Sequence, residues 1–173
     1  MLGDSHVLMW LPALDQVRQA EPDVILVGSA SVIKSAEETT GDLLPPGEAR
    51  GTWRAGARSL ATELVEIAPK VRFLQDANRL PWNPADCLSD LDNSAADCTV
   101  EPSARVTESN RLVRRGIADT GVRQVRLHGL FCVHGRCPTV VDGMAVYGDD
   151  DHLAPDYVRY IADDLEERLA LPA

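Results

Sequence analysis

Short apolar runs alternate with longer segments of helical periodicity along this chain, and this alternation restricts the fold more than any other feature. The clearest run, residues 23–28, is apolar after its first residue and ends at a glycine, as expected for a strand buried in a parallel sheet. Residues 71–74 and 122–127 are predicted to form two further strands. Because strands that alternate with helices build parallel sheets, the pattern indicates an α/β fold.

Three helices are predicted from apolar residues that recur every three or four positions. The first carries Trp53 and extends to Ile67, shortly before a proline. The second spans residues 103–119. The third starts near Pro155, and its apolar residues repeat every four positions as far as Leu169. We expect this last helix to pack on the sheet.

Two other segments have distinct patterns. Residues 139–141 and 144–147 are mostly apolar and flank Asp142-Gly143, a pair that favours the type I′ turn of a β-hairpin. Residues 78–102 are rich in Asp, Asn, Ser and Pro, which predicts a long structured loop of the kind that often carries function.

The composition fits one globular domain over residues 1–173. The net charge of −10 argues against nucleic acid and anionic membrane surfaces as partners, because both bind clustered Lys and Arg. No apolar run approaches the roughly 20 residues that span a membrane. Met1-Leu2 leads directly into a polar motif without a secretory signal, so we expect any export signal or anchor outside this chain.

The four cysteines fall into two local pairs, Cys87 with Cys98 and Cys132 with Cys137. Short-range pairs in loop-rich segments indicate disulfides formed in an oxidising compartment. Four cysteines allow three connectivities, so the pairing itself remains an inference.

A zinc site is the alternative at the second pair. His128, Cys132, His134 and Cys137 lie within ten residues, and zinc favours these ligand types. However, a usual zinc site takes two ligand pairs from separated segments, whereas these four residues crowd one short loop. We therefore expect no metal and no other cofactor.

Two short motifs near opposite ends of the chain carry residues suited to nucleophilic catalysis. Gly3-Asp4-Ser5-His6 supplies a serine, and Asp149 precedes His152 by three residues. A serine hydroxyl is a poor nucleophile until a base removes its proton, and histidine is the usual base near neutral pH. A carboxylate then orients the imidazole and stabilises its charged form.

Together these motifs resemble the SGNH (GDSL-type) hydrolases, in particular the SGNH domains fused to bacterial membrane acyltransferase-3 proteins. The resemblance covers most of the chain. Residues 3–14 are similar to the nucleophile block and first helix, and residues 22–26 to the strand of the second block. Residues 84–88 resemble the cysteine loop of this subgroup, and residues 147–153 its Asp-x-x-His block.

The resemblance implies a role for each matching residue. Ser5 would be the nucleophile, with His152 as the acid–base group and Asp149 as its carboxylate partner. An oxyanion hole would use the backbone N–H of Ser5, the N–H of Gly28 and the side chain of Asn78. Such donors stabilise the negative oxygen that develops in the transition state. The family also implies that the four cysteines form disulfides.

The resemblance further implies a three-layer α/β/α, flavodoxin-like fold with a parallel sheet. Two departures predict a version shortened by one or two strands. Only Met1-Leu2 precede the Gly-Asp-Ser motif, where the family has a full strand. Residues 14–22 also leave no room for the strand that usually follows the first helix. Losing a central strand would loosen the support beneath Ser5.

The function implied is serine-dependent ester hydrolysis or transfer of an acyl group, commonly acetyl, on bacterial cell-surface glycans. The expected partners are an acyl donor, a glycan or small ester substrate and a membrane acyltransferase-3 domain. The expected location is extracytoplasmic, within a larger membrane-anchored protein. The alternative is a catalytically weak or inactive accessory domain that binds glycan or the membrane acyltransferase.

Overall fold

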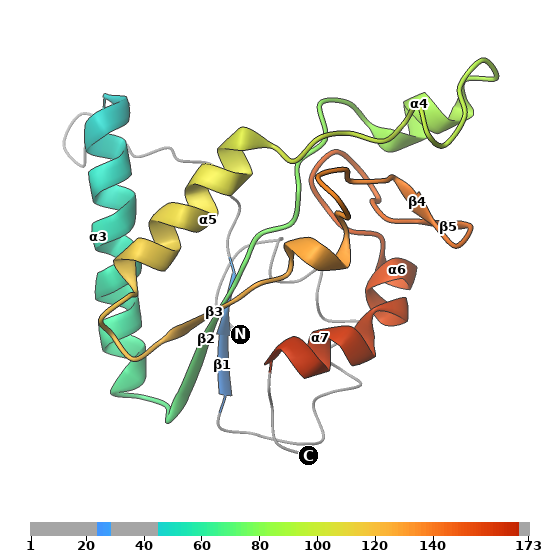
Figure 1. Ribbon diagram of the computed structural model, residues 1–173. Coiled ribbons are helices and arrows are strands. Elements are labelled where there is room, and N and C mark those ends of the chain that lie inside the picture. Colours follow the sequence, from blue (N-terminus) through green and yellow to red (C-terminus); the bar gives the residue numbers. More distant parts are fainter. Residues whose placement is uncertain (1–23, 29–44, 170–173) are drawn as a thin grey trace.

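The computed structural model describes residues 24–28 and 45–169 (Figure 1). The predicted nucleophile block, residues 3–6, lies outside the described residues. The larger elements are, in chain order, β1 (Val24–Val27), α3 (Pro46–Val65), β2 (Lys70–Leu74), α4 (Pro84–Ser89), α5 (Ala104–Gly116) and β3 (Arg123–Val125), then α6 (Pro155–Tyr160) and α7 (Ala162–Leu169). Between β3 and α6 lie a 3₁₀ turn (His128–Leu130) and the short strands β4 (Val140–Val141) and β5 (Met144–Ala145).

The three predicted strands form one parallel sheet in the order β1-β2-β3. Val27 of β1 is paired with Phe73 of β2, and Leu74 is paired with Val125 of β3. All three strands therefore end at the same edge of the sheet. The α/β prediction is confirmed.

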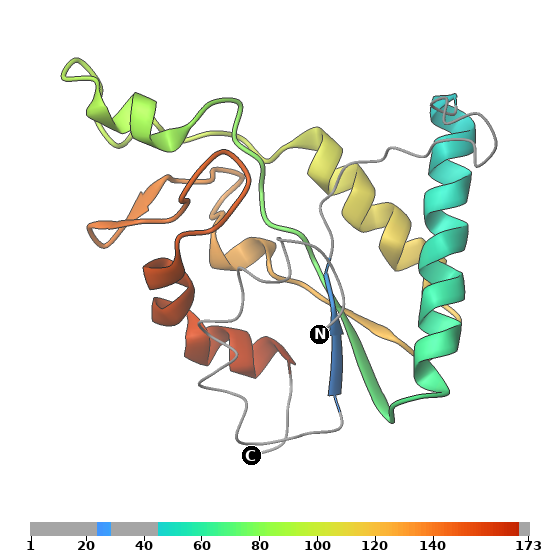
Figure 2. The same ribbon diagram turned by 180° about the vertical axis from the view of Figure 1, so that it is seen from behind.

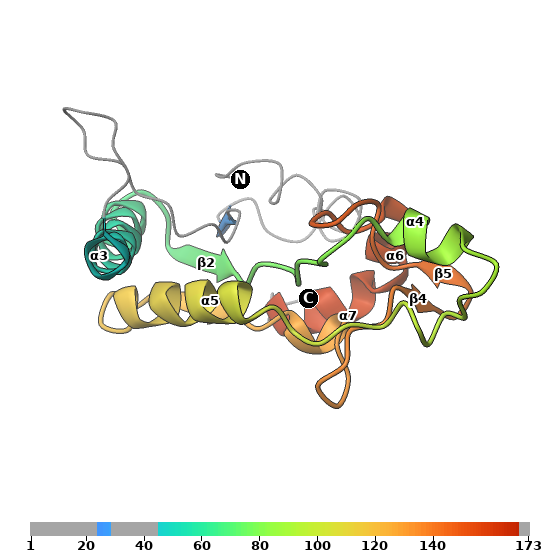
Figure 3. The ribbon, with the colours of Figure 1, turned by 90° about the horizontal axis from the view of Figure 1, so that it is seen from above.

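Helices cover both faces of the sheet, because successive residues of each strand point to opposite sides. One face packs against α3 and α5 through the cluster Ile25, Val27, Val71, Phe73, Ala61, Leu64 and Ile117. The other face packs against α6 and α7 through Leu26, Leu74, Val125, Tyr157, Ile161, Leu165 and Leu169. Figure 3 shows the two helix pairs on separate sides of the molecule. This is the predicted three-layer arrangement.

The α3 helix ends earlier than predicted. The N–H groups of Ile67 and Ala68 both donate to the carbonyl of Leu64, which closes the last turn. Ile67 is 73% exposed, so its assignment to the buried face of the helix was wrong. The α3 and α5 helices are in close contact at Gly116. A Cβ atom at this position would lie 2.5 Å from the carbonyl oxygen of Arg54, so a larger residue would not fit without a shift of the backbone.

The predicted last helix is two helices. The backbone at Ile161 has φ −93° and ψ 14°, outside the helical region, and separates α6 from α7. The apolar residues that repeat every four positions nevertheless remain buried: Tyr157, Ile161, Leu165 and Leu169. The N–H of Ile161 donates to the carbonyl of Tyr157 and that of Leu165 to the carbonyl of Ile161, so the backbone hydrogen bonds continue across the break. The break changes the helix direction without exposing the apolar side.

Both cysteine pairs are disulfides, with S–S distances of 2.02 Å for Cys87–Cys98 and 1.96 Å for Cys132–Cys137. The backbones of Val100 and Cys137 exchange two hydrogen bonds, so the two disulfide segments are joined. In Figures 1 and 2 α4 and the β4–β5 hairpin lie at the same end of the molecule, away from α3.

The predicted hairpin is confirmed. Asp142 and Gly143 both have positive φ, 50° and 77°, as a type I′ turn requires. Among the described residues, no helix is both long and apolar enough to cross a membrane.

Candidate active site

The Asp149–His152 segment is the tip of a small closed loop. Tyr147 and Leu153 form an isolated antiparallel bridge at its base, and the N–H of Gly148 donates to the carbonyl of His152 at 2.9 Å. Both bridge residues are buried in the core. The loop therefore stands on a fixed base, and its polar tip lies at the surface of the core.

The three-residue spacing places the Asp149 carboxylate against the His152 ring. Nδ1 of His152 lies 3.0 Å from both Oδ1 and Oδ2 of Asp149. Oδ1 also accepts hydrogen bonds from the backbone N–H groups of Asp151, at 3.0 Å, and His152, at 2.7 Å. The carboxylate is thus oriented by its own backbone, and it in turn orients the imidazole.

These contacts keep Asp149 ionised. Partial burial raises the pKa of Asp149, but the N–H groups of Asp151 and His152 and the His152 ring together outweigh it, so the pKa lies below its ordinary value. Because the folded-state pKa is depressed, the contribution of Asp149 to stability is present above the ordinary pKa. It is lost as the pH falls through the folded-state pKa.

A second carboxylate approaches the same ring nitrogen. Oδ1 of Asp151 lies 3.0 Å from Nδ1 of His152. The imidazole therefore faces two acidic side chains, of which Asp149 is the one held by two backbone N–H groups.

Asn78 lies on a loop that leaves the end of β2 and is tied down at several points. The backbone of Asp76 exchanges hydrogen bonds with the side chain of Asn110 on α5. Gln75 donates its N–H to the carbonyl of Val125, and its side-chain oxygen accepts from Leu127. These bonds fix the loop to α5 and β3.

The Asn78 amide is buried, with 2% of the residue exposed, and its orientation is fixed by one bond. Oδ1 accepts a hydrogen bond from the N–H of Ser103, the cap of α5, at 2.6 Å. This contact assigns the oxygen and leaves Nδ2 as the other end of the amide. Nδ2 has no hydrogen-bond partner within the described part of the chain. A buried donor without a hydrogen-bond partner destabilises a fold by about 1–3 kcal/mol. An asparagine whose Nδ2 is placed in this way therefore indicates a role other than stability.

The Asn78 loop and the Asp149–His152 loop are in direct contact. The N–H of Leu80 donates to the carbonyl of Asp150 at 2.7 Å. Arg79 Nη2 lies 3.0 Å from Oδ2 of Asp150. The structure therefore brings Asn78 to the same edge of the sheet as Asp149 and His152.

Gly28 is the residue that follows β1, and it is buried. Its neighbour Val27 is paired with Phe73, so Gly28 lies level with the end of β2, from which the Asn78 loop departs. Ser5 belongs to residues 1–23, outside the described ones, and its predicted position beside His152 remains a prediction.

Comparison with known proteins identifies the family. The family model described as "SGNH domain (fused to AT3 domains)" matches residues 16–167. The chain belongs to this SGNH family. The matched range contains Asp149 and His152 and begins after Ser5. No curated protein matches the sequence.

A solved structure supports the fold of this SGNH domain. It is the periplasmic domain of a lipopolysaccharide acetyltransferase from Salmonella ser. Paratyphi A, which aligns with a TM-score of 0.62 at 12% sequence identity. The alignment covers 90% of this chain and 60% of that one. At this identity the likeness concerns the fold.

The zinc alternative does not fit this SGNH domain. His128 and the sulfur atoms of Cys132 and Cys137 lie within 4.8 Å of one another, as a metal site would require. The two sulfur atoms, however, are joined in a disulfide and are not the thiolates that bind zinc. His128 instead packs edge-on against Phe131, and burial lowers its pKa.

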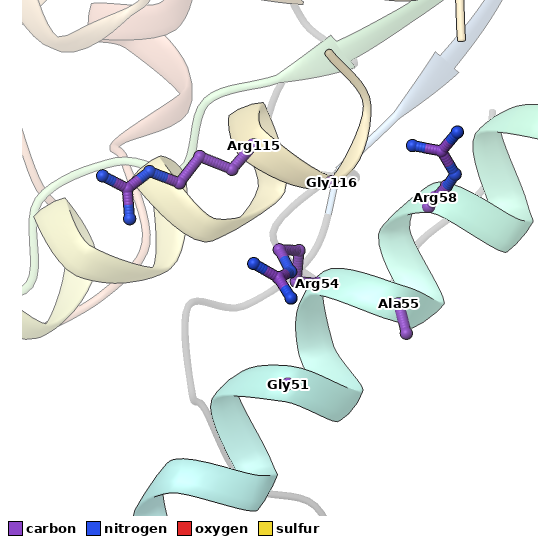
Figure 4. A pocket seen from close by; sticks show the side chains of 6 residues that line it. All are labelled: Gly51, Arg54, Ala55, Arg58, Arg115 and Gly116. Atoms are coloured by element: carbon purple, nitrogen blue, oxygen red, sulfur yellow. The ribbon is translucent and has the colours of Figure 1, made fainter. Parts of the chain in front are cut away.

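A pocket on another part of the SGNH domain does not contain these residues. It has a volume of about 360 Å³, and Gly51, Arg54, Ala55, Arg58, Arg115 and Gly116 line it, between α3 and α5 (Figure 4). The lining offers three exposed guanidinium groups, of which Arg58 is already paired with Asp119 at 3.7 Å. None of the described residues that line it is a serine, cysteine, histidine or carboxylate.

Sequence reasoning missed two residues of the candidate site, Arg79 and Asp151. Asp151 is one of three consecutive acidic residues, and only the fold shows which of them reach the imidazole. The one signal for Arg79 was its position directly after Asn78.

Proposed function

We propose that this SGNH domain transfers acyl groups through an acyl-enzyme on Ser5. The observation that carries the proposal is the Asp149–His152 pair. Its carboxylate is oriented by the backbone and contacts Nδ1. That contact makes Nε2 the ring nitrogen that acts as general base, as in serine hydrolases with a His–Asp pair.

In the first half-reaction, Ser5 Oγ attacks the carbonyl carbon of an ester and transfers its proton to Nε2 of His152. The C–O bond of the ester then breaks, and Nε2 returns the proton to the leaving alkoxide, which departs as an alcohol. In the second half-reaction, Nε2 of His152 removes a proton from the acceptor hydroxyl, whose oxygen attacks the carbonyl carbon of acyl-Ser5. The bond between that carbon and Ser5 Oγ then breaks, and Nε2 returns the proton to Oγ, which regenerates the serine. Water as acceptor gives hydrolysis, and a sugar hydroxyl gives transfer. Asp149 stabilises the imidazolium in both halves.

The buried Nδ2 of Asn78 is proposed as an oxyanion donor, with the N–H groups of Gly28 and Ser5. A donor that is buried and has no partner among residues 24–28 and 45–169 would gain one when a tetrahedral oxyanion forms. The Ser103 contact occupies Oδ1 and so leaves Nδ2 as the end of the amide that would donate to the oxyanion.

Replacing Asn78 with Ala should lower kcat for an acetyl ester by about 10²–10³-fold, with a smaller change in KM, because the lost bond strengthens only in the transition state. Steady-state kinetics measure this split. Asn83→Ala is the matched control, since Asn83 also caps a backbone N–H, that of Ala85, at a helix start. A loss of kcat no larger than that of Asn83→Ala would contradict the oxyanion role.

The proposed substrates are acyl esters of bacterial surface glycans, with acetyl as the group transferred. The fold likeness to a lipopolysaccharide acetyltransferase domain supports this choice. The family description supports a membrane acyltransferase-3 domain as the fused partner. Two disulfides favour an oxidising, extracytoplasmic compartment for this SGNH domain.

An acyl-enzyme predicts burst kinetics. Mixing the protein with excess p-nitrophenyl acetate should release about one equivalent of nitrophenol per chain before the steady state. Peptide mass mapping of the quenched protein should place one acetyl group on Ser5. Acetylation spread over lysines, with no modified Ser5 peptide, would contradict the proposal.

A further inference from the structure

Arg79 lies between the two loops of the candidate site. Its Nη2 is 3.0 Å from Oδ2 of Asp150, and its Nη1 is 3.7 Å from Oδ2 of Asp151. Arg79 directly follows Asn78, and the two aspartates lie between Asp149 and His152 in the chain. The guanidinium of Arg79 thus contacts both residues that lie between Asp149 and His152.

A backbone bond accompanies this contact. The N–H of Leu80 donates to the carbonyl of Asp150, so the two loops are joined by main chain and side chain at adjacent residues. The joined segments are separated by 71 residues in the chain. A guanidinium that engages two carboxylates fixes their relative orientation better than a single ammonium group does.

The charge of Arg79 also bears on the imidazole. The carboxylates of Asp149 and Asp151 each lie 3.0 Å from Nδ1 of His152, and Asp150 adds a third negative charge to the loop. Asp151 uses Oδ1 toward the ring, while Oδ2 faces Arg79. Arg79 therefore contacts Oδ2 of Asp151, the oxygen that points away from the imidazole. Asp151 is also the carboxylate that competes with Asp149 for Nδ1 of His152.

We propose that Arg79 is a positioning residue that joins the Asn78 loop to the Asp149–His152 loop and offsets the charge of Asp151 beside the imidazole. The inference rests on the proposed function and deepens it. Without Arg79 the two loops keep only their backbone bond, and the carboxylate of Asp151 beside the ring loses a positive charge that faces it. A carboxylate that is offset less by nearby positive charge favours the protonated imidazole, which cannot act as a base.

Arg79→Ala should therefore lower kcat for p-nitrophenyl acetate by about 10–100-fold, with KM changed by less than about threefold. The acidic limb of the pH–rate profile should move upward by about 0.5–1 pH unit, because removal of a cation stabilises the imidazolium. Arg79→Lys should restore the position of the acidic limb and recover kcat only in part, since it keeps the charge without the two-carboxylate contact.

Arg159→Ala is the matched control. Arg159 is also half-exposed and pairs with one carboxylate, Asp156, at 2.7 Å on α6. It should leave kcat and the pH profile unchanged. An Arg79→Ala variant that behaves like this control would overturn the inference, as would a fall in kcat with an unmoved acidic limb.

A second variant keeps the inference testable if Arg79→Ala unfolds. Asp151→Asn removes the charge that Arg79 offsets, so in an Asp151→Asn background the additional Arg79→Ala change should move the acidic limb by less than it does in the wild-type background. A movement of the same size in both backgrounds would overturn the role assigned to Asp151. His152→Ala is assayed in parallel: if it retains activity, the proposed function fails, whereas its inactivity together with a normal Arg79→Ala variant refutes Arg79 alone.

Discussion

Replacement of His152 with Ala is expected to lower kcat/KM for acetyl esters by at least about 10⁴-fold, with the protein still folded. The ring is the proposed base for Ser5 in both half-reactions, and loss of such a base removes most of the catalysis that the triad supplies. The loop should persist, because its closure uses the backbone of Gly148 and the bridge between Tyr147 and Leu153. Steady-state kinetics with thermal unfolding as the fold check measure the effect.

His134→Asn is the control for this prediction. His134 is exposed at the tip of a disulfide-closed turn and has φ 51°, a conformation that Asn tolerates well. It should retain full activity. A His152→Ala variant with a similar rate would mean that ester turnover does not pass through the imidazole.

The second large effect is expected for Asp149→Asn, with kcat reduced by about 10⁴-fold. The Asn oxygen can still accept from the N–H groups of Asp151 and His152, so the loop geometry should survive. Its NH₂ group, however, donates where the carboxylate accepted, and this favours the wrong tautomer of His152. The activity of Asp156→Asn, a surface aspartate paired with Arg159, should remain unchanged.

The same variant tests the electrostatics of the loop. The depressed pKa of Asp149 means that its carboxylate stabilises the fold at neutral pH and ceases to do so as the pH falls through that pKa. Asp149→Asn should therefore lose stability relative to wild type at pH 7 and approach wild type at an acidic pH below the folded-state pKa of Asp149. Equal differences in the free energy of unfolding at both pH values would contradict the assigned contacts.

The parts of the fold that follow from local pattern could be predicted from the sequence. The parallel strands and the core-facing helices came from apolar periodicity, and the hairpin came from Asp142-Gly143. The end of α3 at Val65 and the break at Ile161 could not be predicted. Ile67 and Ile161 continue the apolar spacing of their helices. The observed ends of α3 and α6 instead depend on which carbonyl accepts a hydrogen bond from each backbone N–H.

In the candidate site, too, the local contacts could be predicted from the sequence and the long-range contacts could not. The pairing of Asp149 with His152 is local, since three residues bring the carboxylate back to the ring. The contacts of Asn78 with Ser103 and of Arg79 with Asp150 join segments 25 and 71 residues apart, and no local pattern encodes them. Asn78 was identified through the family resemblance, and Arg79 only through the packed structure.

Fluorophosphonate labelling followed by intact-mass analysis tests whether Ser5 is a nucleophile activated by His152. Such a reagent reacts with serines that a neighbouring base has activated. We expect one adduct per chain on Ser5 in the disulfide-intact protein, and none in Ser5→Ala or His152→Ala. Absence of the adduct from a folded wild-type protein, or equal labelling of His152→Ala, would refute the activation of Ser5 by His152 and favour a non-catalytic accessory domain.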